Sequence, residues 1–100
     1  MVKNEEKWRK AISGYRTHIR LEKHLSENTV EAYMRDIVEF EHFVLRMYDV
    51  PPTEVDSAMI ERFLAHLFDT AHKKSSQART LCGIKSFYNY LLINDRMESS

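Results

Sequence analysis

Few side chains in this sequence have the types and the spacing that enzymatic chemistry requires. Its five histidines stand at no metal-ligand spacing from a carboxylate or a cysteine, and neither an HExxH nor a CxxC motif occurs. Cys82 is the single cysteine, so it can form no internal disulfide and has no partners for a zinc site. No glycine-rich phosphate loop is present. The sequence therefore predicts no catalytic residue, no metal and no cofactor for this chain.

One glycine stands where a helix would not be expected to carry it. Gly83 lies in the middle of LCGIKSFYNYLL, residues 81–92, and the chain contains only two glycines. A glycine inside a helix costs about 1 kcal/mol relative to alanine. The helical pattern puts Gly83 opposite the apolar residues, so we expect it to face outward. There it would let a phosphate backbone or a neighbouring helix approach closely, unless it has no such role.

The net charge is zero, but the charges are unevenly distributed along the chain. Residues 1–24 carry seven Lys/Arg and three Glu, residues 25–70 carry three Arg and ten Asp/Glu, and residues 71–100 carry five Lys/Arg and two acids. If the two basic ends meet in space, they form one basic surface on a neutral domain. The alternative is that these charges only solvate helix faces.

The first half of the chain has the apolar periodicity of two helices. The first helix is predicted over about residues 5–24, and Ser26 is a good N-cap for the second, which runs to about Tyr48. Pro51 and Pro52 end it, because proline cannot continue a helix. The predicted buried stripes are Trp8, Ile12, Tyr15 and Ile19 on the first helix, and Val30, Tyr33, Ile37, Phe40, Val44 and Met47 on the second.

The second half predicts two more helices. Asp56 or Ser57 caps the third, and Ser75 or Ser76 caps the fourth, which runs to about Ile93. The predicted buried stripes are Ile60, Phe63, Leu64, Leu67 and Phe68 on the third helix, and Leu81, Ile84, Tyr88 and Leu91 on the fourth. No stretch alternates long enough to form a strand. The fold class is therefore all-α, a bundle of four helices with short connections.

The length of 100 residues fits one domain over residues 1–100. No apolar run approaches the roughly 20 residues that a membrane span needs. The N-terminus lacks the apolar region of a signal peptide. Together with the lone cysteine, these features favour a cytoplasmic location and no membrane partner.

Two segments resemble a known family at ordered positions. LSENTVEAYMRDIVEFEHFV, residues 25–44, and SSQARTLCGIKSFYNYLL, residues 75–92, resemble the N-terminal core-binding domain of tyrosine recombinases of the Xer-like and phage-integrase group. The residues that carry the resemblance are Leu25, Ser26, Asn28, Thr29, Tyr33, Asp36 and Phe40 in the first segment, and Ser75, Ser76, Arg79, Leu81, Gly83, Ile84, Lys85, Phe87, Tyr88, Tyr90 and Leu91 in the second.

The resemblance implies a SAM-like four-helix bundle that grips double-stranded DNA through its second and fourth helices. The implied DNA-binding residues are Asn28, Thr29, Ala32, Arg35, Ser75, Ser76, Arg79, Gly83 and Ser86. Lys74, just before the fourth helix, is added because its charge suits a nonspecific phosphate contact. Hydroxyl and amide side chains near helix N-termini suit phosphates, and arginine suits a phosphate or a guanine edge. Against this, Glu31 and Glu39 lie near the same surface of the second helix.

The resemblance also has implications for the rest of such a protein. The catalytic Arg, Lys, His and Tyr residues of the family belong to a C-terminal domain. We therefore expect this chain to be a fragment without strand-transfer activity. Its further partners would be that catalytic domain and neighbouring recombinase protomers on DNA.

The sequence is also compatible with functions other than DNA binding by a recombinase. Neutral net charge and an acidic middle favour a helical protein–protein interaction domain. A small helix-turn-helix regulator fits less well, because the gap that holds Pro51 and Pro52 is too long for a tight turn. Two variants test which residues are in the core. Arg79→Ala should leave folding intact, whereas Ile84→Ala should lower the free energy of unfolding by about 2–5 kcal/mol.

Overall fold

The computed structural model describes residues 3–21, 25–69 and 74–99, and the side chains of residues 74–76 and 95–99 are not described. The described chain is helical, with one short 3-10 turn and no strand. Its elements are α1 (Asn4–Leu21), α2 (Glu27–Met47), η1 (Pro52–Glu54), α3 (Ser57–Asp69) and α4 (Lys74–Ser99). The predicted all-α bundle of four helices is confirmed.

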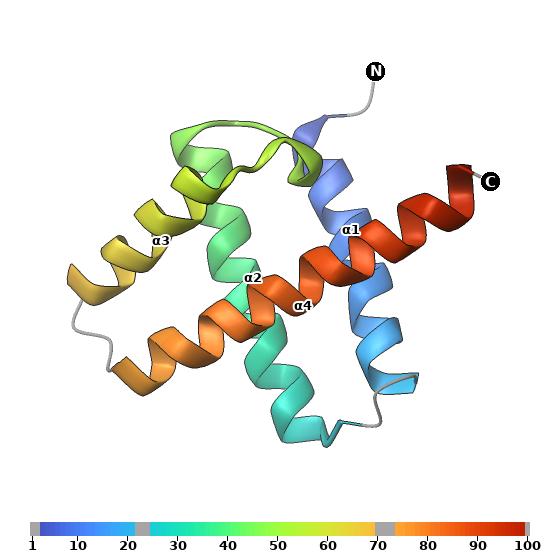
Figure 1. The fold of residues 1–100 in the computed structure, drawn as a ribbon, viewed down its shortest axis with the longest axis horizontal. Coiled ribbons are helices and arrows are strands. Elements are labelled where there is room, and N and C mark those ends of the chain that lie inside the picture. The colour runs from blue at the N-terminus through green and yellow to red at the C-terminus, as the bar shows by residue number, and fades with distance from the viewer. Residues whose placement is uncertain (1–2, 22–24, 70–73, 100) are drawn as a thin grey trace.

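The helix α4 determines the arrangement of the other three. It runs diagonally across α2 and then across α1, while α3 lies beside its N-terminal half (Figure 1). The two chain segments that carry most of the basic residues therefore do meet, because α4 packs on α1. None of the described helices is long and apolar enough to cross a membrane.

Two of the predicted helix starts are confirmed by their hydrogen bonds. The Thr29 amide donates to Ser26 Oγ at 3.3 Å, and the Ser26 hydroxyl donates to Thr29 Oγ1 at 2.9 Å. The Met59 amide donates to Asp56 Oδ1 at 2.9 Å. These bonds satisfy amides that a helix N-terminus leaves without a partner.

The start and the end of α4 differ from the prediction. The helix begins at Lys74, so Ser75 and Ser76 lie in its first turn and neither is the N-cap. It continues to Ser99, six residues beyond the predicted end at Ile93. The first helix was predicted to reach residue 24, and residues 22–24 lie outside the described part of the chain.

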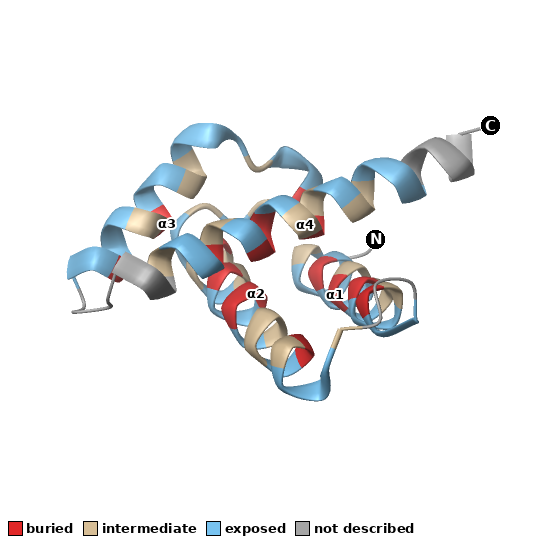
Figure 2. Cartoon of the chain, turned by 60° about the horizontal axis from the view of Figure 1, so that its bottom comes forward, coloured by how far each residue is buried: buried red, intermediate tan, exposed pale blue. Residues whose placement is uncertain are grey.

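Aromatic rings from three helices form the centre of the core. The Trp8 ring of α1 stacks on the Phe87 ring of α4, with their centroids 6.0 Å apart. It meets the Phe40 ring of α2 edge-on, with a centroid distance of 5.8 Å. Phe87 also meets Tyr15 of α1 edge-on at 5.4 Å. Figure 2 shows the buried positions of α1, α2 and α4 turned toward one another. The core thus lies where α4 crosses the α1–α2 pair.

The predicted buried stripes are confirmed to different degrees. All four residues of the α1 stripe are buried, as are Val30, Ile37, Phe40 and Val44 of α2. Two positions are wrong: Met47 is 54% exposed and Phe68 is 58% exposed. Both stand near the C-terminal end of their helix, and Phe68 points away from the side of α3 on which its neighbour Leu67 is buried.

The buried face of α4 is rotated from the predicted one. Its fully buried residues are Thr80, Gly83, Ile84 and Phe87, whereas Leu81, Tyr88 and Leu91 are only half buried. The reason is the crossing geometry, because α4 contacts α2 and α1 at successive turns and α3 on another side. Helix periodicity alone does not show which part of a broad apolar face lies deepest.

The connection between α2 and α3 is attached to the bundle by side-chain hydrogen bonds. The Trp8 indole donates to the Val50 carbonyl at 2.8 Å, and the Tyr88 hydroxyl donates to the Pro52 carbonyl at 2.8 Å. Burial raises the pKa of the Tyr88 phenol, so this donor keeps its proton. The segment between α2 and α3 is therefore hydrogen-bonded to both α1 and α4.

Candidate nucleic-acid interface

The predicted site residues of α2 lie along its N-terminal half. Asn28 and Arg35 are exposed, while Thr29 and Ala32 are half buried. The Thr29 hydroxyl already takes part in the cap that Ser26 forms. Asn28 and Arg35 are therefore the α2 members of the predicted set with the most freedom to contact a ligand.

Three predicted residues of α4 stand at its start. Lys74, Ser75 and Ser76 form the first turn of the helix, as a phosphate-binding N-terminus would require. Their side chains lie outside the described residues, as does the neighbouring Lys73. Their part in an interface remains an expectation from the sequence.

The outward position predicted for Gly83 is wrong, while the neighbouring helix that it was expected to admit is α2. Gly83 is buried and faces Tyr33 of α2, because the buried face of α4 is centred on Thr80, Gly83 and Phe87. A Cβ built on Gly83 would lie 3.7 Å from Cδ1 of Tyr33. Gly83 therefore contributes to the packing of α4 on α2.

The outward position predicted for Ser86 is also wrong. Ser86 is half buried and lies on the α1 side of α4, close to Tyr15. Burial raises the pKa of the Tyr15 phenol, and its interaction with Ser86 lowers that pKa in part. The cause is again the crossing, since the side of α4 that was expected to face outward packs against α2 and α1 at successive turns.

Arg79 is exposed, as predicted, but its charge is already paired. Its Nε donates to Asp36 Oδ2 at 3.0 Å and its Nη2 donates to Asp36 Oδ1 at 3.1 Å. The Asp36 side chain is 7% exposed and that of Arg79 is 43% exposed. Hydrogen bonding to Asp36 raises the pKa of Arg79, so the guanidinium stays charged. This bidentate pair of hydrogen bonds joins α2 to α4 on the side of the candidate interface.

The expectation that Arg79→Ala leaves folding intact is therefore not supported by this geometry. The substitution would leave a buried carboxylate on α2 without its partner. The sequence did contain a signal of this pairing. Asp36 stands three residues after Tyr33 and four before Phe40 of the predicted α2 stripe, so helix periodicity puts its carboxylate beside that stripe, where it needs a partner.

Three further exposed residues of α4 stand outside the predicted site set. Ala78, Cys82 and Lys85 are exposed, and Lys85 adds a positive charge on the side that faces α3. Glu31 and Glu39, which carry the opposite charge to Lys85, are exposed on α2. The surface around the α2–α4 crossing is thus polar and mixed in charge, and it is not uniformly basic.

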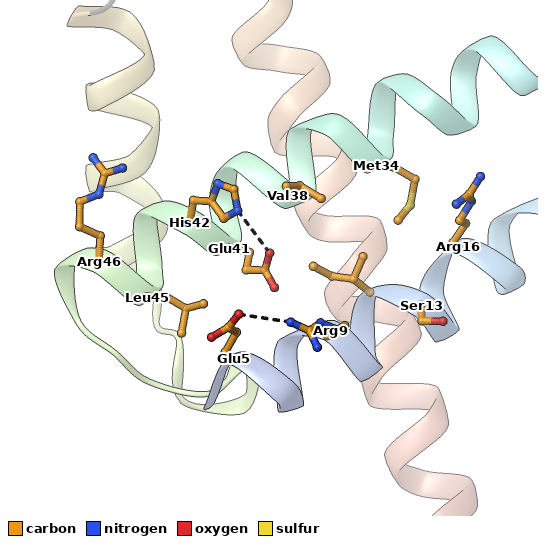
Figure 3. A pocket seen from close by; sticks show the side chains of 11 residues that line it. Glu5, Arg9, Ser13, Arg16, Met34, Val38, Glu41, His42, Leu45 and Arg46 are labelled. Atoms are coloured by element: carbon orange, nitrogen blue, oxygen red, sulfur yellow. Dashed lines mark hydrogen bonds and ion pairs between the residues drawn. The ribbon is translucent and has the colours of Figure 1, made fainter. Parts of the chain in front are cut away.

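A separate groove of 720 Å³ lies between α1 and α2 (Figure 3). Apolar side chains, including Met34, Val38 and Leu45, line it together with charged ones. Figure 3 shows Arg9 paired with Glu5 and His42 beside Glu41. The Glu41 side chain is only 13% exposed, and burial raises the pKa of its carboxyl. None of the predicted site residues lines this groove.

Comparison with known proteins identifies related sequences. The family described as phage integrase, N-terminal SAM-like domain, matches residues 12–94. The tyrosine recombinase XerC of Pelobacter propionicus is 43% identical over an alignment of 83 positions, which covers 81% of this chain and 27% of that protein. The tyrosine recombinase XerD of Chlorobaculum tepidum is 32% identical over 92% of this chain and 30% of its own length. The chain thus spans less than a third of these relatives. No solved structure matches.

Proposed function

This chain belongs to the phage integrase N-terminal SAM-like domain family, and from that membership we propose that it is a DNA-binding module of a tyrosine recombinase. In this proposal duplex DNA lies against α2 and α4 during recombination. Strand transfer itself is assigned to a catalytic domain of such a recombinase. Neighbouring recombinase protomers on the DNA are the further proposed partners.

The observation that carries this proposal is the crossing of α2 and α4. It brings Arg79 of α4 beside the half of α2 that presents Asn28 and Arg35. Arginine bonds phosphates and guanine edges in DNA, and asparagine bonds phosphates and adenine edges. The first turn of α4, where Lys74, Ser75 and Ser76 stand, provides amides that suit a phosphate.

The test measures binding of the chain to a random DNA duplex by fluorescence anisotropy, repeated across a series of salt concentrations. We expect weak nonspecific binding, with a dissociation constant on the order of 10⁻⁴–10⁻⁶ M at physiological salt. A plot of the logarithm of the association constant against the logarithm of the salt concentration should fall with a slope of roughly 0.9 for each neutralised phosphate. No binding at low salt would contradict the proposal.

A matched pair of variants locates the surface. Arg35→Gln removes a charge on the α2–α4 side and should lower the salt slope by about 0.9. Arg46→Gln removes the same charge from the far end of α2, where Arg46 lines the α1–α2 groove. It should leave the slope unchanged. Equal effects of the two variants would mean that DNA does not lie against the proposed face.

A protein–protein interaction domain is the second candidate function. The zero net charge and the apolar floor of the α1–α2 groove favour it. If the chain binds no DNA at low salt while remaining folded, this second function becomes the better account.

A further inference from the structure

We infer that Asp36 positions Arg79 so that the outer edge of its guanidinium reads a single guanine in the major groove of duplex DNA. This inference rests on the proposed function, because it requires DNA to lie against α2 and α4. It makes Arg79 a specificity-determining residue. Asp36 is then a positioning residue, which acts through Arg79 and does not contact DNA.

The geometry of the pair leaves the reading edge of Arg79 open. Asp36 occupies the side edge of the guanidinium, formed by Nε and Nη2, at 3.0 and 3.1 Å. The end edge, formed by Nη1 and the second hydrogen of Nη2, points away from the carboxylate. Two parallel donors at that end edge match the O6 and N7 acceptors of guanine. The Arg79 side chain is 43% exposed, which leaves room for such a contact.

The position of the guanidinium is fixed by buried structure. Asp36 is 5% exposed and stands between the packed Tyr33 and Ile37 on α2. One turn further along α4, Gly83 packs on Tyr33 and holds the two helices close. An arginine held by a buried carboxylate loses little further side-chain freedom when it binds. Most exposed arginines lack such support.

The same pairing argues against a phosphate as the ligand of Arg79. Asp36 balances the charge of Arg79, and the exposed Glu39 adds further negative potential at the guanidinium. A locally neutral pair attracts a phosphate weakly and releases few counterions. Its directional hydrogen bonds are unaffected, and a base edge is a neutral acceptor that uses them fully. The ligand is therefore a base edge.

The experiment begins with selection of the preferred sites of the 100-residue chain from a randomised duplex library. Each guanine in the selected site is then replaced by 7-deazaguanine, which removes the N7 acceptor and keeps base pairing and charge. For one guanine, the replacement should weaken binding by about 5- to 100-fold, the range for a bidentate base contact. If no replacement weakens binding, the inference is wrong.

A double variant assigns that contact to Arg79. Asp36→Asn with Arg79→Gln removes both charges together, so that no buried charge is left without a partner and the net charge stays zero. The double variant should lose the response to 7-deazaguanine while its salt slope stays within about 0.3 of the original, since a balanced pair neutralises no phosphate. Retention of the full response would overturn the inference.

The single variant Asp36→Asn tests positioning separately from folding. It frees the charge of Arg79, so nonspecific binding should become more salt-dependent while the guanine preference falls. A merely structural role for Asp36 would change the melting temperature and leave the salt slope as it was. Arg35→Gln is the control, since it should lower the salt slope and keep the guanine preference.

The failure of this inference can be told from failure of the proposed function. If the chain binds DNA with a salt slope but without a guanine response from Arg79, only the inference fails. If it binds no DNA at low salt, both fail. Circular dichroism of each variant confirms that the helices remain folded.

Discussion

Two residues of α4 have surroundings in the structure that differ from those expected from the sequence. Gly83 was expected to face outward, and it is buried against Tyr33. Arg79 was expected to be a free surface charge, and it is bound by both oxygens of Asp36. In each case a residue of α2 decides the environment of a residue far along the chain, 43 positions away for Asp36 and Arg79. These contacts lead to the first two predictions.

Gly83→Ala should stabilise the chain. A Cβ at this position would meet Tyr33 at an ordinary van der Waals distance of 3.7 Å, so a methyl group fits. Alanine favours a helix interior over glycine by about 1 kcal/mol. Thermal unfolding should therefore show a melting temperature raised by roughly 4–8 °C.

A larger residue at the same position provides the control. Gly83→Leu should lower the melting temperature, because its side chain would overlap the Tyr33 ring. DNA binding by the alanine variant should equal that of the original chain, since Gly83 is buried. A fall in the stability of Gly83→Ala would show that α4 and α2 lie closer than this packing implies.

Arg79→Ala should destabilise the chain. It leaves the buried Asp36 carboxylate without the donors at 3.0 and 3.1 Å. An unsatisfied buried acceptor costs about 1–3 kcal/mol, and we expect the lower half of that range because Arg79 is partly exposed and water can replace it. Chemical denaturation measures the change in the free energy of unfolding.

The matched control for Arg79→Ala is Arg35→Ala. Arg35 is an exposed arginine on the neighbouring helix, and its loss should change the free energy of unfolding by less than about 0.5 kcal/mol. Equal stability of the two variants would mean that the Asp36 pair contributes nothing to folding.

At the scale of elements, α1 and α2 enclose a carboxylate in the groove between them. The half-buried Glu41 of α2 lies among apolar groove residues such as Val38 and Leu45. Burial raises the pKa of Glu41 above its ordinary value of 4.5, His42 and Arg9 lower it in part, and Glu5 raises it. The packing of α1 on α2 therefore disfavours the charged form of this residue.

The stability of the α1–α2 pair should depend on the protonation of Glu41. The folded chain holds the Glu41 proton more tightly than the unfolded chain does, so the favourable contribution is complete below pH 4.5. It is lost as the pH rises through the raised pKa. Glu41→Gln should remove this loss, and the variant should be more stable than the original chain at neutral pH.

Thermal unfolding of both chains from pH 3.5 to pH 7.5 measures that difference. The gap in melting temperature between variant and original should widen as the pH rises. Glu31→Gln, on the exposed side of α2, is the control and should show no such widening. A constant gap for Glu41→Gln would show that water reaches the carboxylate in the groove.

At the scale of the whole molecule, Trp8 connects most of the bundle. Its ring contacts Phe40 of α2 and Phe87 of α4, and its indole bonds the Val50 carbonyl before η1. Trp8 is fully buried. The domain is small, so one residue at the meeting point of three helices carries a large share of its stability.

Trp8→Ala should therefore bring the chain close to unfolding. Removal of a buried tryptophan costs about 3–5 kcal/mol, against a total of about 5–15 kcal/mol for a typical domain. Urea denaturation followed by circular dichroism should show a midpoint shifted far toward zero denaturant. Leu92→Ala, at a position on α4 that is 59% exposed, should leave the midpoint almost unchanged.

The sequence by itself determined the helices and most of their buried residues. The spacing of Trp8, Ile12, Tyr15 and Ile19 specifies one face of a helix without reference to any partner, and the caps at Ser26 and Asp56 are local hydrogen bonds. Family resemblance added the SAM-like fold, which the family match over residues 12–94 supports. Local periodicity and capping depend on residues only a few positions apart, so they can be read from the chain directly.

Only the tertiary structure decided which face of α4 is buried and which charges of the candidate interface are free. Both depend on the crossing of α4 over α2 and α1, which joins residues far apart in the sequence. That crossing buries Gly83, turns Ser86 toward Tyr15, and sets Asp36 against Arg79. Helix periodicity gives the direction of a side chain around its own axis, but the packing angle between two helices determines what that side chain meets.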